Sequence, residues 1–204
     1  MMSEQKTLTP EYFDRVYAAS DDPWNFTSSE YEAGKYAATL AALPRENYQN
    51  AFEIGCSIGV LTAQLAARCG EILAVDVSEK ALEQAKKRCA NLPNVRLRLM
   101  SIPNEFPGEF FDLILISEVG YYLAPADWLA AMDKIFAQLA EGGQIALVHW
   151  TPPVHDYPQT GDAVHNSFAE FATGKMRNLK SFRKEKYRLD VWEKLPIKPI
   201  GLSL

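Results

Sequence analysis

The sequence predicts a single α/β domain in which helices cover both faces of a mostly parallel sheet. Its 204 residues are enough for one compact domain with a sizeable core, but not for two large domains. Through the middle of the chain, short apolar segments alternate with segments of helical period, and fully apolar strands are typical of a parallel sheet buried on both sides. We expect right-handed connections between the parallel strands.

The individual elements follow from the same patterns. We expect strands at residues 50–55, 72–76, 94–100, 111–117, 144–150, 176–186 and 187–194. We expect helices at residues 10–18, 30–42, 60–69, 78–90, 125–140 and 163–173. Ser78 has the character of an N-cap, and the glycines at 142 and 143 that of a helix stop. Residues 101–110 contain two prolines and a glycine, which favour a loop or a very short helix.

Composition and charge exclude several classes of protein. A hydrophobic fraction of 48% argues against disorder, and a net charge of −5 argues against a protein built to hold nucleic acid. Residues 171–204 carry nine Lys or Arg and three acids, so the first 170 residues carry −11. Such a basic segment is typical of a solvated surface. No apolar run reaches the roughly 18 residues of a membrane helix, and no signal pattern opens the chain.

Cysteine usage bears on the compartment. The three cysteines, at 56, 69 and 89, are odd in number and have no C-x-x-C spacing. Together with the missing signal pattern, this indicates reduced thiols. We therefore expect a cytoplasmic protein with no membrane contact.

The strongest functional signal follows the first expected strand. The loop reads Glu53-Ile-Gly-Cys-Ser-Ile-Gly59, so a strand ends in glycines and a helix begins. Glycines let a ligand approach the backbone, and the helix start offers free N–H groups. Asp76 stands seventeen residues after Gly59, at the end of the second strand, where an acid can accept hydrogen bonds from two ribose hydroxyls. The alternative is a tight strand-to-helix turn with a capping Asp.

The same loop indicates which cofactor it takes. The dinucleotide fingerprint G-x-G-x-x-G uses its second glycine to let the backbone touch a pyrophosphate. Ser57 stands at that position here, so the loop lacks a pyrophosphate cradle. A phosphate-free cofactor that joins a ribose to an amino acid fits better, and S-adenosylmethionine is such a molecule.

Three segments resemble class I S-adenosylmethionine-dependent methyltransferases: E-x-G-x-x-x-G, A-V-D-V-S and F-D-L-I-L-I-S-E-V-G-Y-Y-L. DDPW at 21–24 and S-E-V-G-Y-Y-L further resemble the nodulation protein S group, which N-methylates a deacetylated chitooligosaccharide. The resemblance covers roughly residues 10–194. It implies a Rossmann-like class I methyltransferase fold, with a mostly parallel seven-stranded sheet whose last strand is antiparallel. Ser57 departs from the glycine that many members have there.

The resemblance also implies a set of site residues. Gly55, Cys56 and Gly59 would lie along the methionine part of the cofactor, and Asp76 would hold the ribose. The other expected cofactor contacts are Glu53, Ser57, Val77 beside the adenine, Ser101 and Ile102 flanking it, Ser117 and Glu118 next to the methyl group, and Trp24 with Tyr31 over the pocket. Acceptor contacts are expected from Tyr121, Tyr122, His149 and His165. The alternative for Trp24 is a structural one, fastening the N-terminal helix to the body.

All three histidines fall at or just after the fifth expected strand, within residues 149–165. Ligands bind at the carboxyl ends of strands in open α/β sheets, so this grouping indicates proton handling or recognition of a polar acceptor. An alternative interpretation takes the histidines, with Asp156 and Asp162, as metal ligands. Their spacings match no compact metal site, and we expect no metal. His149 as a satisfied structural histidine remains the alternative.

We therefore predict methyl transfer from S-adenosylmethionine, with S-adenosylhomocysteine as product. The acceptor is a small polar molecule, foremost the amine of an amino sugar or oligosaccharide. His149 or Glu118 would accept its proton, or Glu118 would position it. O-methylation of a glycan or another small molecule, a non-catalytic cofactor-binding partner protein and a nicotinamide-dependent oxidoreductase are the alternatives, and Ser57 argues against the last.

We expect one domain over residues 1–204. Residues 1–48 form an N-terminal helical lid and residues 49–150 the cofactor-binding core. Residues 151–194 supply the substrate-side loop, a helix and the last two strands, and residues 195–204 a tail. Whether the protein is a monomer or a homodimer is left open by the sequence.

Overall fold

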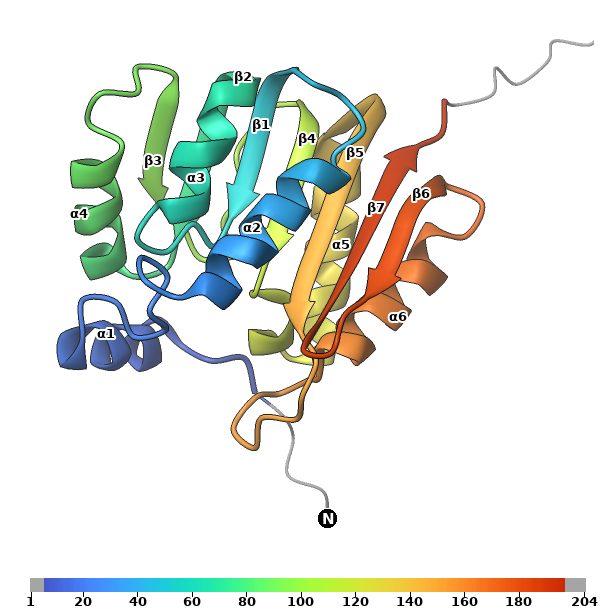
Figure 1. The fold of residues 1–204 in the computed structure, drawn as a ribbon. Coiled ribbons are helices and arrows are strands. Elements are labelled where there is room, and N and C mark those ends of the chain that lie inside the picture. The colour runs from blue at the N-terminus through green and yellow to red at the C-terminus, as the bar shows by residue number, and fades with distance from the viewer. Residues whose placement is uncertain (1–5, 197–204) are drawn as a thin grey trace, which may run out of the picture.

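The computed structural model describes residues 6–196, whose centre is a seven-stranded sheet with the order β3-β2-β1-β4-β5-β7-β6 (Figure 1). The strands are β1 (Tyr48–Ile54), β2 (Cys69–Asp76), β3 (Val95–Leu99), β4 (Phe111–Ser117), β5 (Leu139–Trp150), β6 (Met176–Arg183) and β7 (Tyr187–Lys194). Strands β3, β2, β1, β4 and β5 pair in parallel, whereas β7 pairs antiparallel with both β5 and β6. The predicted α/β class and the antiparallel last strand are confirmed.

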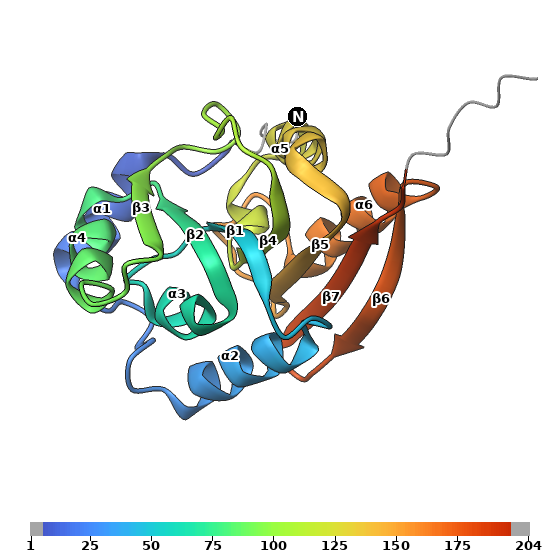
Figure 2. The ribbon, with the colours of Figure 1, turned by 90° about the horizontal axis from the view of Figure 1, so that it is seen from above.

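Helices cover both faces of this sheet. They are α1 (Pro10–Ala19), α2 (Glu30–Ala42), α3 (Val60–Leu65), α4 (Glu79–Arg88), α5 (Pro125–Gln138) and α6 (Gly161–Ala172), with the 3-10 turns η1 (Ala66–Arg68) and η2 (Gly120–Tyr122). Viewed from above, α2 and α3 lie on one side of the strands, and α5 and α6 on the other (Figure 2). Residues 1–5 of the expected lid and 197–204 of the expected tail lie outside the described residues.

Alternating side chains of the central strands fill the two halves of the core. On β4, Ile114 and Ile116 pack with the helices α5 and α6, while Leu113 and Leu115 pack with α2 and α3. All four side chains are at most 1% exposed, so both faces of this strand are shielded from water. Each such side chain contributes roughly 1.5–3 kcal/mol to the free energy of folding, which explains the unbroken apolar run FDLILIS.

Several predicted boundaries differ from the structure, most clearly at two junctions between a helix and a strand. Helix α5 ends at Gln138 and β5 begins at Leu139, so the expected glycine stop lies inside a strand. Gly142 has a φ of 68° there, and the register between β4 and β5 shifts near that end. The expected helix at 60–69 tightens into η1 after Leu65, because β2 begins at Cys69, three residues earlier than expected. In both places strand pairing overrides the local helical pattern.

The strand order reverses at β1, so the carboxyl end of this strand lies where two parts of the sheet diverge. The chain runs from β1 outward to β2 and β3 on one side, and later returns to β4 and β5 on the other. Ligands of open α/β sheets bind at such a reversal of strand order. The N-terminal segment crosses this edge, and the backbone N–H of Leu8 donates to the carbonyl of Tyr122 at 2.9 Å.

Candidate active site

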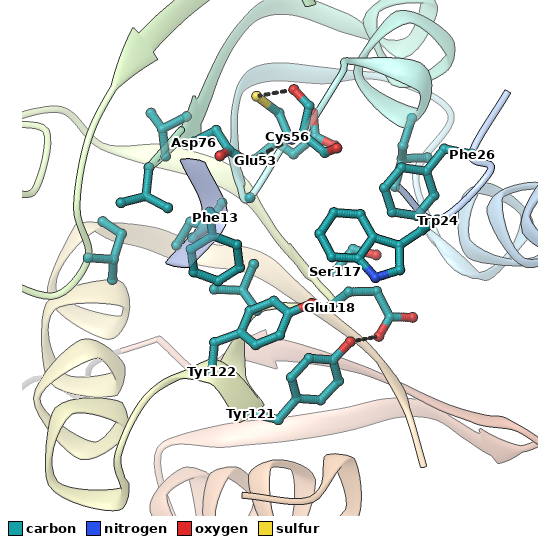
Figure 3. Close-up of a pocket in the computed structure, with 18 of the residues that line it drawn as sticks. Phe13, Trp24, Phe26, Glu53, Cys56, Asp76, Ser117, Glu118, Tyr121 and Tyr122 are labelled. Atoms are coloured by element: carbon teal, nitrogen blue, oxygen red, sulfur yellow. Dashed lines mark hydrogen bonds between the residues drawn. The ribbon is translucent and has the colours of Figure 1, made fainter. Parts of the chain in front are cut away.

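A cavity of about 310 Å³ lies at the carboxyl ends of β1, β2 and β4. Its walls come from the glycine loop, the ends of the strands, the segment of η2 and the N-terminal residues 7–36. Figure 3 shows Asp76, Glu53 and Cys56 at one end of the cavity, and Glu118 with Tyr121 at the other. The cavity therefore joins residues that lie far apart in the sequence.

The glycine loop needs its unusual backbone at Gly55. This residue has a φ of +81°, and a Cβ built on it would lie 2.1 Å from Cγ2 of Val119. Ser57 also has a positive φ, of 50°, and its Oγ is 2.5 Å from the hydroxyl of Tyr17 on α1. Gly55, Cys56 and Ser57 all line the cavity, where the predicted cofactor contact would take place.

Gly59 does not line the cavity. It is the N-cap of α3 with a φ of 78°, and a Cβ there would lie 3.1 Å from Cα of Ala85 on α4. Its lack of a side chain lets α3 and α4 approach each other. The structure thus gives Gly59 a packing role in place of the expected cofactor contact.

Asp76 ends β2 with both carboxylate oxygens held by backbone. Oδ2 accepts from the N–H of Ser57 at 2.8 Å, and Oδ1 accepts from the N–H of Ser78 at 2.9 Å. Burial raises the pKa of Asp76, and these backbone hydrogen bonds oppose that rise. Since each carboxylate oxygen can accept two hydrogen bonds, Asp76 retains one acceptor position on each oxygen for a ligand.

Glu53 is a second buried carboxyl group in the cavity wall. It is 1% exposed, and its Oε2 has no hydrogen-bond partner among the described residues. Burial raises the pKa of Glu53 to about 7, with a smaller opposing effect from the hydroxyl of Thr62. Near neutral pH this group can therefore act as an acceptor or, when protonated, as a donor.

Glu118 follows β4 and is locked in place by three donors. Its Oε2 accepts from the N–H of Trp150 at 2.8 Å and from the hydroxyl of Tyr121, and its Oε1 is 2.5 Å from Nζ of Lys35. Glu118 has a φ of 60°, a conformation that side chains rarely adopt and that concentrates at functional sites. The carboxylate thus has a fixed orientation at the cavity wall.

The DDPW segment forms a turn that directs aromatic rings into the cavity. The carboxylate of Asp22 accepts from the N–H of Phe26 at 2.7 Å and from the N–H of Thr27 at 2.9 Å. Trp24 stacks on Phe26 with ring centroids 5.5 Å apart, and it meets the ring of Tyr17 edge to face. Both Trp24 and Phe26 line the cavity.

The remaining expected contacts divide into two groups. Val77, Ser101, Ile102, Ser117, Tyr121 and Tyr122 line the cavity. Tyr31 does not. Its ring packs edgewise against Trp150 and Tyr187, and its hydroxyl is buried with no hydrogen-bond partner in the described part of the chain. Tyr31 instead borders a shallow depression beside the turn between β6 and β7.

His149 and His165 lie behind the cavity, fully buried, and neither lines it. The N–H of Gly120 donates to Nε2 of His149 at 3.0 Å, so the ring proton is on Nδ1, which lies 3.1 Å from Nε2 of His165. His165 in turn donates from Nδ1 to Asp190 at 2.6 Å. Burial lowers the pKa of both rings. The expected contact of these histidines with the acceptor is corrected: they anchor η2.

His155, the third histidine, is exposed and pairs with Asp156. Within residues 6–196 we find no group of three His, Cys, Asp or Glu side chains placed to hold a metal ion. The three cysteines are free. In the same residues, every helix is too short or too polar to cross a membrane.

Comparison with known proteins identifies the family. The model of the family "Nodulation protein S (NodS)" matches residues 11–149. The chain belongs to the nodulation protein S family. Nodulation protein S of Rhizobium tropici is 30% identical over 129 residues, which are 62% of this chain and 54% of that protein. The Bradyrhizobium diazoefficiens protein is 33% identical over 124 residues, which are 60% of this chain and 59% of that protein. The matches thus span less than two thirds of these relatives.

Solved structures confirm the class I methyltransferase fold. The N-methyltransferase NodS from Bradyrhizobium japonicum WM9, in complex with S-adenosyl-L-homocysteine, superposes with a TM-score of 0.80 at 23% identity. The superposition covers 90% of this chain and 97% of that one. A Pseudomonas syringae protein provisionally assigned as a methyltransferase is 38% identical, with a TM-score of 0.73 and coverage of 81% of this chain and 100% of that one.

Sequence reasoning missed the charged groups that helix α2 brings to this cavity. Lys35 on α2 is 2% exposed and contacts Glu32, one turn earlier, as well as Glu118. Burial by itself lowers the pKa of Lys35, but the two carboxylates outweigh it and raise the pKa overall. The spacing of Glu32 and Lys35 is that of an ordinary surface ion pair. Only the packing of α2 over the cavity gives the pair a place in the site.

Proposed function

We propose that this chain is an S-adenosylmethionine-dependent methyltransferase that acts on a small polar acceptor. The observation that carries this proposal is the geometry of Asp76. Its carboxylate keeps two free acceptor positions, and it lies beside Gly55 at the point of the sheet where strand order reverses. Family membership and the fold of the NodS complex support the same assignment.

The lining residues fit such a cofactor. Asp76 would accept from the two ribose hydroxyls, while Val77, Met100 and Ile102 provide apolar walls for a flat base. Gly55 lines the cavity beside them, and its lack of a Cβ lets Val119 pack against the loop. When bound, S-adenosylmethionine supplies a methyl group on a sulfonium, which is a good leaving group. Ser57 also fits a cofactor without a pyrophosphate. Its backbone N–H donates to Asp76 and is therefore not available to a phosphate oxygen.

The chain's own residues then place the reactants and keep water out. Trp24 and Phe26 cover the cavity from the N-terminal side, and Glu118 presents a fixed carboxylate at its other end. Holding an acceptor in line with the methyl group supplies much of the rate of such a reaction. Oε1 of Glu118 accepts a hydrogen bond from Lys35 and can accept one more. Glu118 can therefore hold an N–H or O–H of the molecule that receives the methyl group.

For the acceptor we propose the amine of an amino sugar or oligosaccharide. Support comes from the resemblance to the nodulation protein S group and from the relative described as an N-methyltransferase. O-methylation of a glycan or another small molecule is the second candidate. We place the protein in the cytoplasm because its three cysteines are free and lack C-x-x-C spacing.

Two measurements test this assignment. In the first, the protein is titrated calorimetrically with S-adenosylhomocysteine and, in parallel, with NAD. We expect binding of the former only, and binding of NAD alone would overturn the assignment. In the second, labelled S-adenosylmethionine is offered with a deacetylated chitooligosaccharide and with its N-acetylated counterpart. We expect label on the amine. Label on a hydroxyl would establish the second candidate, and binding without any transfer would favour a non-catalytic partner protein.

A further inference from the structure

Helix α1 is bonded to both of the serines that hold Asp76. The backbone N–H groups of Ser57 and Ser78 donate to the two carboxylate oxygens of Asp76, at 2.8 and 2.9 Å. The side-chain hydroxyl of each serine bonds to α1. The hydroxyl of Ser57 lies 2.5 Å from that of Tyr17, and the hydroxyl of Ser78 donates to Asp14 at 3.2 Å. Helix α1 therefore contacts both supports of this carboxylate.

The same helix packs against the glycine loop. In Figure 1, α1 lies next to α4 at the carboxyl end of the strands. Phe13 and Tyr17 are its buried side chains, and they share an apolar cluster with Ile58 of the loop and Ala81 of α4. Tyr17 is 5% exposed, although it lines the cavity. The ring of Tyr17 is thus fixed by packing, and its hydroxyl by the bond to Ser57.

The two serines differ in how much they need this helix. Ser78 is the N-cap of α4, with an ordinary φ of −98°, and its hydroxyl also accepts from the N–H of Ala81 at 3.4 Å. Its position is therefore set by α4. Ser57 has a φ of 50° and lies in the loop before Gly59, the N-cap of α3. Residues with a side chain rarely adopt this left-handed conformation, so Ser57 needs a support from outside the loop.

We infer that Tyr17 is a positioning residue for cofactor binding, which acts through Ser57 on the carboxylate of Asp76. This inference rests on the proposed methyltransferase function. The hydroxyl of Tyr17 keeps Ser57 in its left-handed conformation, in which the N–H of Ser57 donates to Asp76. The carboxylate then has one orientation before the ligand arrives, and its free acceptor positions need no ordering when ribose hydroxyls bind.

The residue at position 57 must supply two things for this role. Glycine would adopt the positive φ freely, but it has no hydroxyl to bond to Tyr17. Serine supplies the hydroxyl, and the bond to Tyr17 offsets the strain of its backbone. The two hydroxyls form a single bond, so removing either of them should have the same consequence as removing both.

Two other roles for the hydroxyl of Tyr17 lead to different results. A hydroxyl that contacted the cofactor directly would contribute to binding whether or not Ser57 had its own hydroxyl. A hydroxyl that only held α1 in place would contribute to the stability of the protein, and its removal would leave the affinity of the folded protein unchanged.

The test is a double-mutant cycle measured by calorimetric titration with S-adenosylhomocysteine. Y17F keeps the packed ring, and S57A keeps the backbone N–H that donates to Asp76. We expect each variant to weaken binding by about threefold to tenfold, as for the loss of one hydrogen bond, and the double variant to be no weaker than either. Y12F, a tyrosine of the same helix outside the cavity wall, and D14A are the matched controls and should bind as wild type.

Thermal midpoints without ligand show that each variant is folded at the temperature of the titration. Equal affinity of Y17F and wild type overturns the inference, whether or not the midpoint falls. The same loss from Y17F in the S57A background as in wild type also overturns it, because Tyr17 would then act on the cofactor directly. Failure of the wild-type protein to bind S-adenosylhomocysteine overturns the proposed function, and the inference with it. Binding by wild type with no loss in either variant overturns the inference alone.

Discussion

Asp76 and Glu53 are both buried carboxyl groups in the same cavity, but their partners differ. Asp76 accepts two backbone N–H groups, which stabilise its charged form, whereas Oε2 of Glu53 accepts no hydrogen bond from the described residues. The pKa of Glu53 accordingly rises to about 7 because of burial. At the residue scale, the first of these groups is prepared for a ligand as an anion, and the second changes its protonation state near neutral pH.

This difference makes the stability of the protein depend on pH through Glu53. In the unfolded chain the group ionises near its ordinary pKa of 4.5, but in the folded protein only near 7. Between these values the folded state binds the extra proton, so the free energy of unfolding falls as pH rises. We expect wild type to lose about 3 kcal/mol relative to Glu53→Gln between pH 4 and pH 8. Urea denaturation at several pH values measures this difference.

Parallel pH profiles for the two proteins would contradict that expectation. They would mean that Glu53 ionises in the folded protein as it does in the unfolded chain. Thr62→Val keeps the carboxyl group and removes the hydroxyl that opposes the rise of its pKa, so its stability should fall with pH at least as steeply as that of wild type.

How much of the site the sequence foretold depends on how local each feature is. Gly55 and Asp76 lie in a short motif whose backbone geometry fixes their position, and both line the cavity. His149 was misplaced because the pattern of β5 gives its strand but not which neighbours fill the space around its ring. Lys35 and Glu32 were missed because only the docking of α2 turns an ordinary helical ion pair into part of the cavity wall.

At the scale of elements, η2 depends on a chain of side chains that starts at His149. The N–H of Gly120, the ring of His149, the ring of His165 and the carboxylate of Asp190 form consecutive hydrogen bonds. Every donor in this chain has one acceptor, and burial lowers the pKa of both rings, which favours their neutral form. The chain ties η2, which carries Tyr121 and Tyr122 to the cavity, to α6 and β7.

We expect His149→Ala to destabilise the protein by about 2–5 kcal/mol, because it leaves two buried polar groups unpaired and opens a cavity. Chemical denaturation measures the loss. The exposed His155 provides the control, and His155→Ala should change stability little. Full stability of the His149 variant, combined with a tenfold loss of turnover, would instead show that His149 takes part in the methyl-transfer reaction.

The N-terminal segment is the element whose behaviour we expect to change with ligand. Its turn at Asp22 directs Trp24 and Phe26 into the cavity, where a bound cofactor would contact both rings. We expect amide hydrogen exchange over residues 20–32 to slow when S-adenosylhomocysteine is added, while exchange over α5 stays unchanged. Equal exchange over residues 20–32 with and without ligand would favour the alternative, in which Trp24 only packs helix α1 against the rest of the protein.

Element boundaries show a similar division between local and tertiary causes. The sequence foretold α2, β4 and β7 to the residue, because capping signals or a sharp change of polarity bound them. It misplaced the start of β5 by five residues, since pairing of Leu139 with Phe111 extends the strand through a glycine pair that resembles a helix stop. The short helix η2 went unforeseen because three residues carry no period.

For the whole molecule, the sheet order brings the ends of β1, β2 and β4 together, and the N-terminal helices close the space above them. The charged residues are also unevenly distributed about this cavity. The acidic groups Glu32, Glu53, Asp76 and Glu118 line the cavity, whereas none of the basic residues of 171–196 does. A cavity with this surplus of carboxyl groups favours a ligand that carries hydroxyl or amine donors.

The central claim is that Asp76 holds the ribose of an S-adenosyl cofactor in this cavity, and calorimetric titration with S-adenosylhomocysteine tests it most directly. We expect Asp76→Ala to weaken binding by about 1.5–3 kcal/mol for each lost hydrogen bond. Thermal midpoints show whether the variant is still folded, and Asp14→Ala, which alters a neighbouring carboxylate outside the cavity wall, is the control. The account predicts a loss of affinity of at least tenfold in a folded Asp76 variant and none in the control. Equal affinity for wild type and a folded Asp76→Ala protein would contradict it.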